Sequence, residues 1–263
     1  LEKALVYGQA PVVNRDHEGE IKDKGDTVRV TSLGDITVSD YTRNADIAPP
    51  QELTEEQRTL LITEGKTFNF AIDDADAAQA AGNVMPEAIT KATYALAEVA
   101  DRFIASHYTD ADAANVLTPG TVTTGDQAYN LLVDLGTKLN EASVPATGRW
   151  VVVPPWFVGL MQKGSTAMLA ATAGVIPPEE MRNGMVGRVS GFDILVSNNV
   201  PETSGNYKII GGAPGAISYA EQINKLEAYR PKRRFADALK GLHLYGAKVM
   251  DPQQLAVIEA VRA

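Results

Sequence analysis

With 263 residues, 44% of them hydrophobic and 22% charged, the chain has ordinary globular composition and enough length for one or two domains. It contains no cysteine, which excludes disulfides, thiolate catalysis and cysteine-ligated metals and favours synthesis in a reducing cytoplasm. The formal net charge of -9 disfavours overall attraction to nucleic acid, although a local basic patch could still contact it. No apolar run approaches the roughly 18 residues of a membrane-spanning helix, so we expect no membrane association.

The first part of the chain predicts an extended arm followed by short strands. Residues 1–14 show no strong periodicity, which is typical of an arm. Short segments after the arm alternate apolar and polar side chains, as half-buried strands do: residues 27–31, 35–39, 59–62 and 67–72. The last two segments flank a turn that contains Gly65 and predict a β-hairpin with Phe68 and Phe70 on one face.

Residues 15–72 are therefore expected to form a long ribbon that is poor in large apolar side chains. Two-stranded ribbons are marginally stable alone in water. We expect this one to lie on a neighbouring domain or subunit; an ordinary antiparallel sheet within one domain is the alternative.

The next part of the chain predicts helices. Asp73, Asp74 and Asp76 open a short helix that ends at Gly82, and helix capping is preferred over cation binding for these carboxylates. Apolar residues recur at helical spacing from 86 to 107, which predicts a helix about 33 Å long at roughly 1.5 Å per residue. The later predicted elements are a helix over 126–141, a strand over 148–153, a short helix over 156–163, a hairpin of 186–189 with 193–197, and a strand over 207–210.

The titratable residues form no recognisable catalytic pattern. His17, His107 and His243 fall in different predicted elements without metal-ligand spacing, so we expect structural roles for all three. Residues 159–166 resemble a phosphate-binding loop, but the lysine precedes the second glycine instead of following it. We therefore expect no catalytic residue, no cofactor and no metal, and a protein that is not an enzyme.

A dense basic cluster lies near the end of the chain, at Arg230, Lys232, Arg233 and Arg234. Three interpretations stay open for it. It can be a solvated surface run, an intersubunit salt-bridge site, since arginine pairs well with carboxylates at interfaces, or a local contact with DNA.

The ordered set of segments resembles the major capsid protein of tailed bacteriophages. Leu226 to Val249 combines strand-forming residues, an Arg-Pro break and the basic cluster, as the C-terminal part of that family does. The ribbon up to Phe70, the long helix over 86–107, the Arg149–Pro155 strand and the Gly191–Pro201 segment follow in the family's order.

The resemblance implies an α+β fold of the Hong Kong 97 type, with an arm, an extended β-hairpin loop, a peripheral domain built on a long spine helix, and an axial domain. The implied bounds are 1–14 for the N-terminal arm, 15–72 for the extended loop, 73–124 with 223–250 for a discontinuous peripheral domain, and 125–222 with 251–263 for the axial domain.

The resemblance also implies a function. The chain is expected to assemble into pentamers and hexamers of an icosahedral phage head that encloses double-stranded DNA, contacted weakly and without sequence specificity. Expected partners are further copies of itself, a portal and possibly a decoration protein, with assembly in the cytoplasm of the bacterial host. Because the sequence starts at Leu1 without a long scaffolding segment, a separate or removed scaffolding protein is implied.

Subunit contacts are expected in the loop and near the end of the chain. The expected interface residues are Arg29, Phe68 and Phe70 in the loop and Arg230, Arg233 and Arg234 near the end. The competing interpretations are an encapsulin-like nanocompartment shell, which uses the same fold, an enzyme with an active site assembled from scattered residues, and a phage decoration or tail protein.

Overall fold

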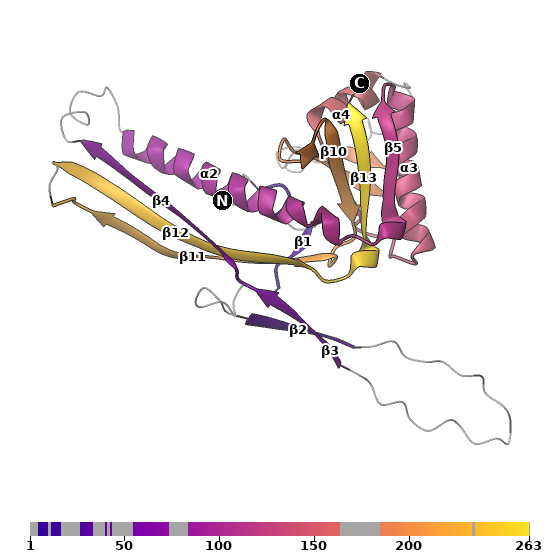
Figure 1. The fold of residues 1–263 in the computed structure, drawn as a ribbon, viewed down its shortest axis with the longest axis horizontal. Helices are drawn as coiled ribbons and strands as arrows, with labels where there is room; N and C mark the ends of the chain where they lie inside the picture. The colour runs from indigo at the N-terminus through magenta and orange to yellow at the C-terminus, as the bar shows by residue number, and fades with distance from the viewer. Residues whose placement is uncertain are drawn as a thin grey trace.

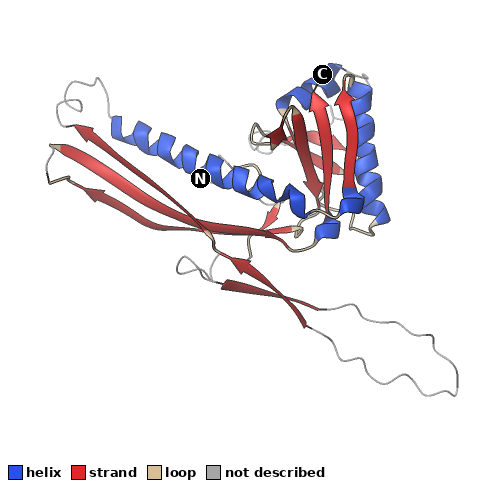
Figure 2. Ribbon diagram, viewed as in Figure 1, coloured by secondary structure: helices blue, strands red, loops and turns tan. Residues whose placement is uncertain are grey.

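The computed structural model describes residues 5–9, 12–16, 27–33, 40, 43, 55–73, 84–163, 185–232 and 235–262. Within these residues, strands and helices form two bodies and a projecting ribbon (Figures 1 and 2). Predicted positions that fall outside them are His17, residues 35–39, residues 74–83 and the basic residues Arg233 and Arg234.

The first body is a four-stranded sheet with a long helix along it. The sheet has the order β1-β11-β12-β4, in which β11 and β12 form a long antiparallel hairpin and β1 joins β11 in parallel. The bounds are β1 Val13–Asn14, β4 Glu64–Asp73, β11 Ile217–Tyr229, β12 Ala236–Val249 and helix α2 Val84–Ser106. The ring of Phe103 on α2 packs edge-on against Tyr245 on β12, with centroids 5.4 Å apart, which identifies the sheet face that α2 covers.

The second body is a seven-stranded sheet with the order β5-β13-β10-β6-β8-β7, and β9 pairs with β10 beside this path. Its strands are β5 Val116–Val122, β6 Trp150–Val153, β7 Met185–Val189, β8 Phe192–Val196, β9 Glu202–Thr203, β10 Asn206–Gly212 and β13 Leu255–Arg262. Helices α3 Gly125–Glu141 and α4 Pro155–Lys163 lie on one face of it (Figure 2). No described helix has the combination of length and apolar sequence that crossing a membrane requires.

The central strand β6 is buried on both faces, which explains its uninterrupted run of apolar side chains. Val151 and Val153 pack into the core beneath α3 and α4. Trp150 and Val152 point the other way, into the core that α2 and the N-terminal segment share. The two bodies therefore meet across one continuous apolar layer.

The ribbon projects away from both bodies and consists of β2 Thr27–Leu33 and β3 Glu55–Leu61 in antiparallel register (Figure 1). The predicted hairpin between residues 59–62 and 67–72 is wrong. Residues 59–61 pair with β2, whereas residues 67–72 pair with β12, where Phe70 lies opposite Leu239. Residues 67–72 pair with the distant strand β12 because Leu60 and Ile62 are buried against Ala220 and Leu244. The chain therefore crosses the sheet at this point instead of turning back on itself.

Other sequence predictions are confirmed. The helices expected over 86–107, 126–141 and 156–163 are α2, α3 and α4, and the hairpin of 186–189 with 193–197 is β7 and β8. Several pairings cross the expected domain bounds. β4 joins the sheet of α2, β5 pairs with β13, β1 pairs with β11, and residues 217–222 of β11 pair with β12.

The chain passes between the two bodies three times, and the passages are tied to one another. The short helical segments at these passages are η2 His107–Asp110, η3 Ala113–Asn115 and η4 Pro252–Gln254. The Asp112 amide donates to the carbonyl of Pro252 at 3.1 Å, the Met250 amide to that of Ala216 at 2.8 Å, and the Ala213 amide to that of Gln254 at 3.1 Å. We call this set of passages the junction.

Candidate assembly surfaces

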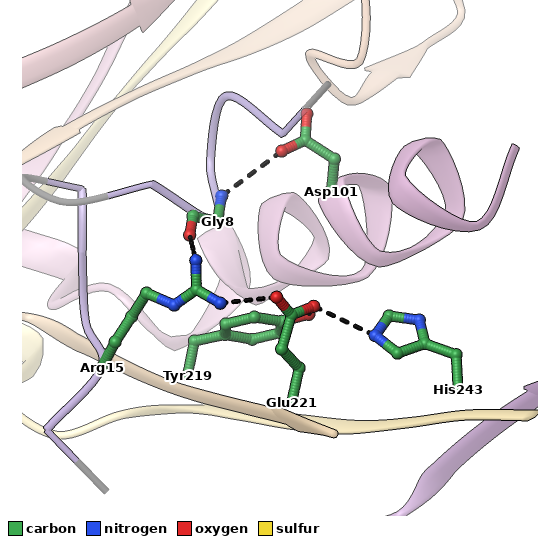
Figure 3. A network of polar contacts seen from close by, with 6 residues as sticks. All are labelled: Gly8, Arg15, Asp101, Tyr219, Glu221 and His243. Carbon is green, nitrogen blue, oxygen red and sulfur yellow. Dashed lines mark hydrogen bonds and ion pairs between the residues drawn. The ribbon is translucent and has the colours of Figure 1, made fainter. Parts of the chain in front are cut away.

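A buried carboxylate on α2 fixes the N-terminal segment. Oδ1 of Asp101 accepts hydrogen bonds from the backbone amides of Val6, Tyr7 and Gly8 at 2.9, 2.6 and 3.4 Å, and Oδ2 accepts one from the Asn199 side chain at 3.0 Å. Figure 3 shows the bond from Gly8. Asp101 is fully buried, and this burial raises its pKa, while the four hydrogen bonds act in the opposite direction. One side chain thus joins the N-terminal segment, the long helix and the loop after β8.

A second carboxylate, Glu221 on β11, holds the next part of the same segment. Its Oε1 lies 2.5 Å from the guanidinium of Arg15, and its Oε2 accepts hydrogen bonds from the Tyr219 hydroxyl at 2.7 Å and from His243 Nε2 at 3.0 Å (Figure 3). Burial alone would raise the pKa of Glu221. The hydrogen bonds from His243 and Tyr219 and the charge of Arg15 outweigh burial and lower this pKa to about 2.

Arg15 connects the two carboxylate sites, because its guanidinium also donates to the carbonyl of Gly8 at 3.3 Å. The structural role expected for His243 matches its position, fully buried in β12 beside Glu221. The sequence reasoning did not single out Asp101, Glu221 or Arg15. A signal was present for Asp101, since helical spacing places it with the apolar residues Ala97 and Ile104 on the buried side of α2.

The structure brings Phe68 and Phe70 together on β4. Their rings stack with centroids 5.9 Å apart, and both side chains are half-buried on the face that holds Leu239 and Gly241 of β12. A Cβ atom at Gly241 would lie 2.3 Å from the Phe68 ring, so this glycine leaves the space that the ring occupies. The aromatic pair packs partly on its own sheet and leaves part of its surface accessible.

The remaining predicted interface residues are spread over the molecule. Arg29 lies in β2 opposite Thr59 of the projecting ribbon. Arg230 lies more than 60% exposed just beyond the end of β11, and its Nε is 2.9 Å from Asp237 Oδ1. The ribbon and the turn of the β11–β12 hairpin therefore present their predicted residues at two separate places.

Among the residues that the structure describes, no three His, Cys, Asp or Glu side chains gather where they could hold a metal ion. The buried carboxylates of Asp101 and Glu221 instead accept hydrogen bonds: Asp101 from backbone amides, and Glu221 from arginine and histidine.

Comparison with known proteins decides the family. The family model described as phage capsid protein matches residues 54–258, which run from β3 to β13. The chain belongs to the phage capsid protein family. No curated protein sequence matches this phage capsid protein.

Solved structures agree with the family match. The capsid protein is similar to a structure from Mycobacterium phage Che8, with 30% identity, coverage of 95% of this chain and 89% of that chain, and a TM-score of 0.73. It is also similar to the capsid of cyanophage P-SCSP1u, with 15% identity, coverage of 92% and 85%, and a TM-score of 0.72. The expected Hong Kong 97-type capsid fold, with its mixture of helix and sheet, is confirmed.

The same fold occurs in a nanocompartment shell. The holo-SrpI encapsulin complex from Synechococcus elongatus PCC 7942 matches with 14% identity, coverage of 91% and 83%, and a TM-score of 0.62. At this identity the likeness concerns the fold.

The family match and the Che8 structure together give the capsid protein a structural function and place it in the virion.

Proposed function

We propose that this phage capsid protein is the major subunit of an icosahedral head, assembles into pentamers and hexamers, and encloses double-stranded DNA. The observation that carries the proposal is the family match over residues 54–258 together with the 30% identity to the Che8 structure over nearly the whole chain. Two further phage structures that match carry capsid titles, those of cyanophage P-SCSP1u and Ralstonia phage GP4.

The two bodies and the ribbon correspond to three proposed domains of the subunit. We assign the peripheral domain to α2 with the four-stranded sheet, the axial domain to the seven-stranded sheet with α3 and α4, and the extended loop to the ribbon. Compared with the bounds expected from sequence, this assignment moves β1, β4 and residues 217–222 of β11 into the peripheral domain and β5 into the axial domain, because strands that pair in one sheet fold as one unit.

The ribbon is proposed to stabilise the shell by lying across a neighbouring subunit. It has two strands, and two-stranded ribbons need another surface to be stable in water. Arg29 on the ribbon is one proposed contact. The half-buried Phe68 and Phe70, which lie part-way along β4 opposite Gly241 and Leu239 of β12, are two more. Arg230, with Arg233 and Arg234 of the same basic cluster, is the proposed contact near the turn of the β11–β12 hairpin.

Further partners follow from the same proposal. A scaffolding protein, a portal and a decoration protein would act with this subunit during assembly in the bacterial cytoplasm. The net charge of -9 would keep contacts with packaged DNA weak and non-specific, since phosphate binding requires clustered positive charge. A purely structural role, without catalysis or cofactor, is part of the proposal.

Negative-stain electron microscopy with size-exclusion chromatography tests the proposal. The full chain is expressed with its neighbouring phage genes, which include any scaffolding protein, and purified particles are treated with nuclease. Closed shells, or rings of five and six subunits, with DNA protected inside, are the expected result. A protein that stays monomeric at high concentration with these partners present would overturn the proposal.

The nanocompartment is the second candidate, supported by the TM-score of 0.62 to the SrpI encapsulin. The same particles separate the two candidates. A phage head carries a portal at one vertex and DNA, whereas a nanocompartment contains a co-purifying protein cargo and no portal.

A further inference from the structure

The most exposed large hydrophobic side chain that the structure describes is Phe235, which is 84% exposed. It immediately precedes β12, at the turn of the β11–β12 hairpin, next to the basic residues 230–234. Leu226 on β11 is also 62% exposed, so the outer half of this hairpin presents apolar surface in an otherwise acidic protein. Single exposed apolar residues are common on protein surfaces, so the exposure of Phe235 indicates a binding surface only together with a neighbouring feature.

An open groove lies between the start of α2 and the outer part of the hairpin. These two elements lie at the same end of the molecule (Figure 1). Its walls are mostly apolar, with Met85 and Ile89 from α2 and Ala228, Ala238 and Leu239 from the sheet. Tyr229 and the ion pair of Arg230 with Asp237 form its polar rim. Methionine adapts to the shape of an inserted aromatic ring, and a groove of this composition suits one.

We propose that Phe235 of one subunit inserts into this groove of an adjacent copy, between α2 and the β11–β12 hairpin. The inference rests on the proposed shell function and names a contact within it. Phe235 does not fill the groove of its own chain, since it stays 84% exposed. A projecting ring and a receiving groove on one end of the same molecule are complementary when copies are related by rotation about an axis near that end.

The charges around the two features support a second copy as the occupant. Phe235 is preceded by the basic run of residues 230–234, and the rim of the groove carries Arg230 beside the carboxylate of Asp237. The Arg230–Asp237 pair is solvated, with both side chains more than 60% exposed, and a carboxylate can accept from more than one donor. Asp237 can therefore receive a cation from the incoming basic run while it keeps its own arginine.

The contact joins two different surfaces, so it is heterologous. A heterologous contact forms a closed ring when the rotation between copies closes and an open chain when it does not. Each subunit then gives one aromatic ring and receives one, and all copies around the axis are equally satisfied.

The absence of cysteine from the sequence makes a disulfide test clean. Phe235→Cys and Ile89→Cys are produced as two separate full-length variants and co-assembled in a 1:1 mixture under mild oxidation. A bond forms only when the two Cβ atoms come within about 4.5 Å. The matched control replaces Ile89→Cys by Thr90→Cys, which is exposed on the next position of the same helix.

The expected result is a cross-linked dimer in the mixture with Ile89→Cys, and a reducing agent should cleave it. The mixture with Thr90→Cys should give at least tenfold less of this dimer. Mass spectrometry should identify the peptide that links positions 235 and 89. A chain carrying both substitutions should give a ladder that ends at the number of copies around the axis. A double variant that forms only an intramolecular bond, with no ladder, would overturn the proposal, because position 235 would then contact the groove of its own chain.

A second measurement separates assembly from folding. Phe235→Ala should reduce the yield of closed particles at least fivefold and leave the melting temperature of the unassembled subunit unchanged, because the side chain is exposed there. If the wild type assembles, no specific cross-link forms and Phe235→Ala assembles equally well, the Phe235 contact is overturned while the shell function stands. If the wild type forms no particle with its partners, the shell function fails and this inference fails with it.

Discussion

His243 Nε2 and Glu221 Oε2 lie 3.0 Å apart on neighbouring strands, beneath the segment that Arg15 ties to the same carboxylate. With its pKa lowered to about 2, Glu221 is ionised at neutral pH and can only accept hydrogen bonds. The proton between the two residues therefore belongs to His243 Nε2. This pair and Asp101 together determine the path of the N-terminal segment across the sheet.

We expect the unassembled subunit to lose stability in acid because of Glu221. A lowered pKa means that the stabilisation is complete above the ordinary value of 4.5 and is lost as pH falls towards about 2. Each tenfold change in proton affinity corresponds to about 1.4 kcal/mol, so the full loss is about 3 kcal/mol. Urea unfolding between pH 7 and pH 2.5 measures it.

Glu221→Gln provides the control for this acid loss. The variant should be less stable at pH 7 and should show a flatter dependence between pH 4.5 and pH 2.5. Asp101 cannot produce the same trend, since its pKa is raised and its contribution favours the folded state as pH falls. An unchanged slope in Glu221→Gln would contradict the assignment.

Asp101→Ala should release the N-terminal segment. The substitution removes the acceptor of three backbone amides and of Asn199, and each buried donor left without a partner costs about 1–3 kcal/mol. We expect a loss of about 2–4 kcal/mol in the free energy of unfolding, given partial rehydration of the segment. Hydrogen exchange at Tyr7 and Gly8 should accelerate strongly while α3 stays protected.

Asp101→Asn is the matched comparison. Its amide oxygen can still accept from the backbone amides, and Asn199 can rotate its side-chain amide to accept from the new donor. We expect less than half of the loss measured for Asp101→Ala. Equal losses in the two variants would mean that the charge matters more than the hydrogen bonds.

Gly246→Ala should disturb the crossing of the chain over β12. A Cβ atom there would lie 2.3 Å from the backbone oxygen of Leu61, which cannot rotate away. Added atoms in a packed site cost about 1–3 kcal/mol, and the ribbon should change its direction. Gly159→Ala in α4, with no atom within 4 Å, should instead be neutral or slightly stabilising in the same thermal unfolding assay.

Arg149→Lys should destabilise the end of α3. The buried guanidinium donates to three carbonyls, those of Gly136, Val144 and Pro145, around the last turn of that helix. Lysine has no planar fork and cannot reach all three positions. We expect a loss of about 2–3 kcal/mol in urea unfolding, at about 1 kcal/mol or more for each lost bond to a charged donor. A loss below about 0.5 kcal/mol would show that water replaces these bonds freely.

Local patterns were sufficient to predict some of the regular elements of the capsid protein, namely α2, α3, α4, β6 and the β7–β8 hairpin, but not β5 or β13. Helix α2 repeats its apolar residues at helical spacing. At the start of α3, the side chains of Thr124 and Gln127 form a reciprocal cap. Strand β6 has an uninterrupted apolar run because both of its faces are buried. In these cases the neighbouring residues alone carry the information.

The pairing of strands and the buried polar sites depended on distant residues. Whether residues 67–72 turn back on 59–62 or join β12 is decided by Gly241, which makes room for Phe68, and by the burial of Ile62. Likewise, Glu221 gains its partners only when Arg15 and His243 meet it from other parts of the chain. The exposure of Phe235 and the groove beside it depended equally on how α2 lies on the hairpin.

The junction has a mechanical consequence. Three passages of the chain cross it, hydrogen bonds tie these passages to one another, and the Asn199–Asp101 bond adds a further link between the bodies. A load on the body of the seven-stranded sheet would pass into the body of α2 with little bending, because tilting one body would strain every passage at once. Differences in local curvature among subunits of one shell would then be absorbed in the slender regions beyond the junction, the ribbon and the outer hairpin. Stiffness at the centre and compliance at the edges would let one sequence occupy several positions of a closed surface.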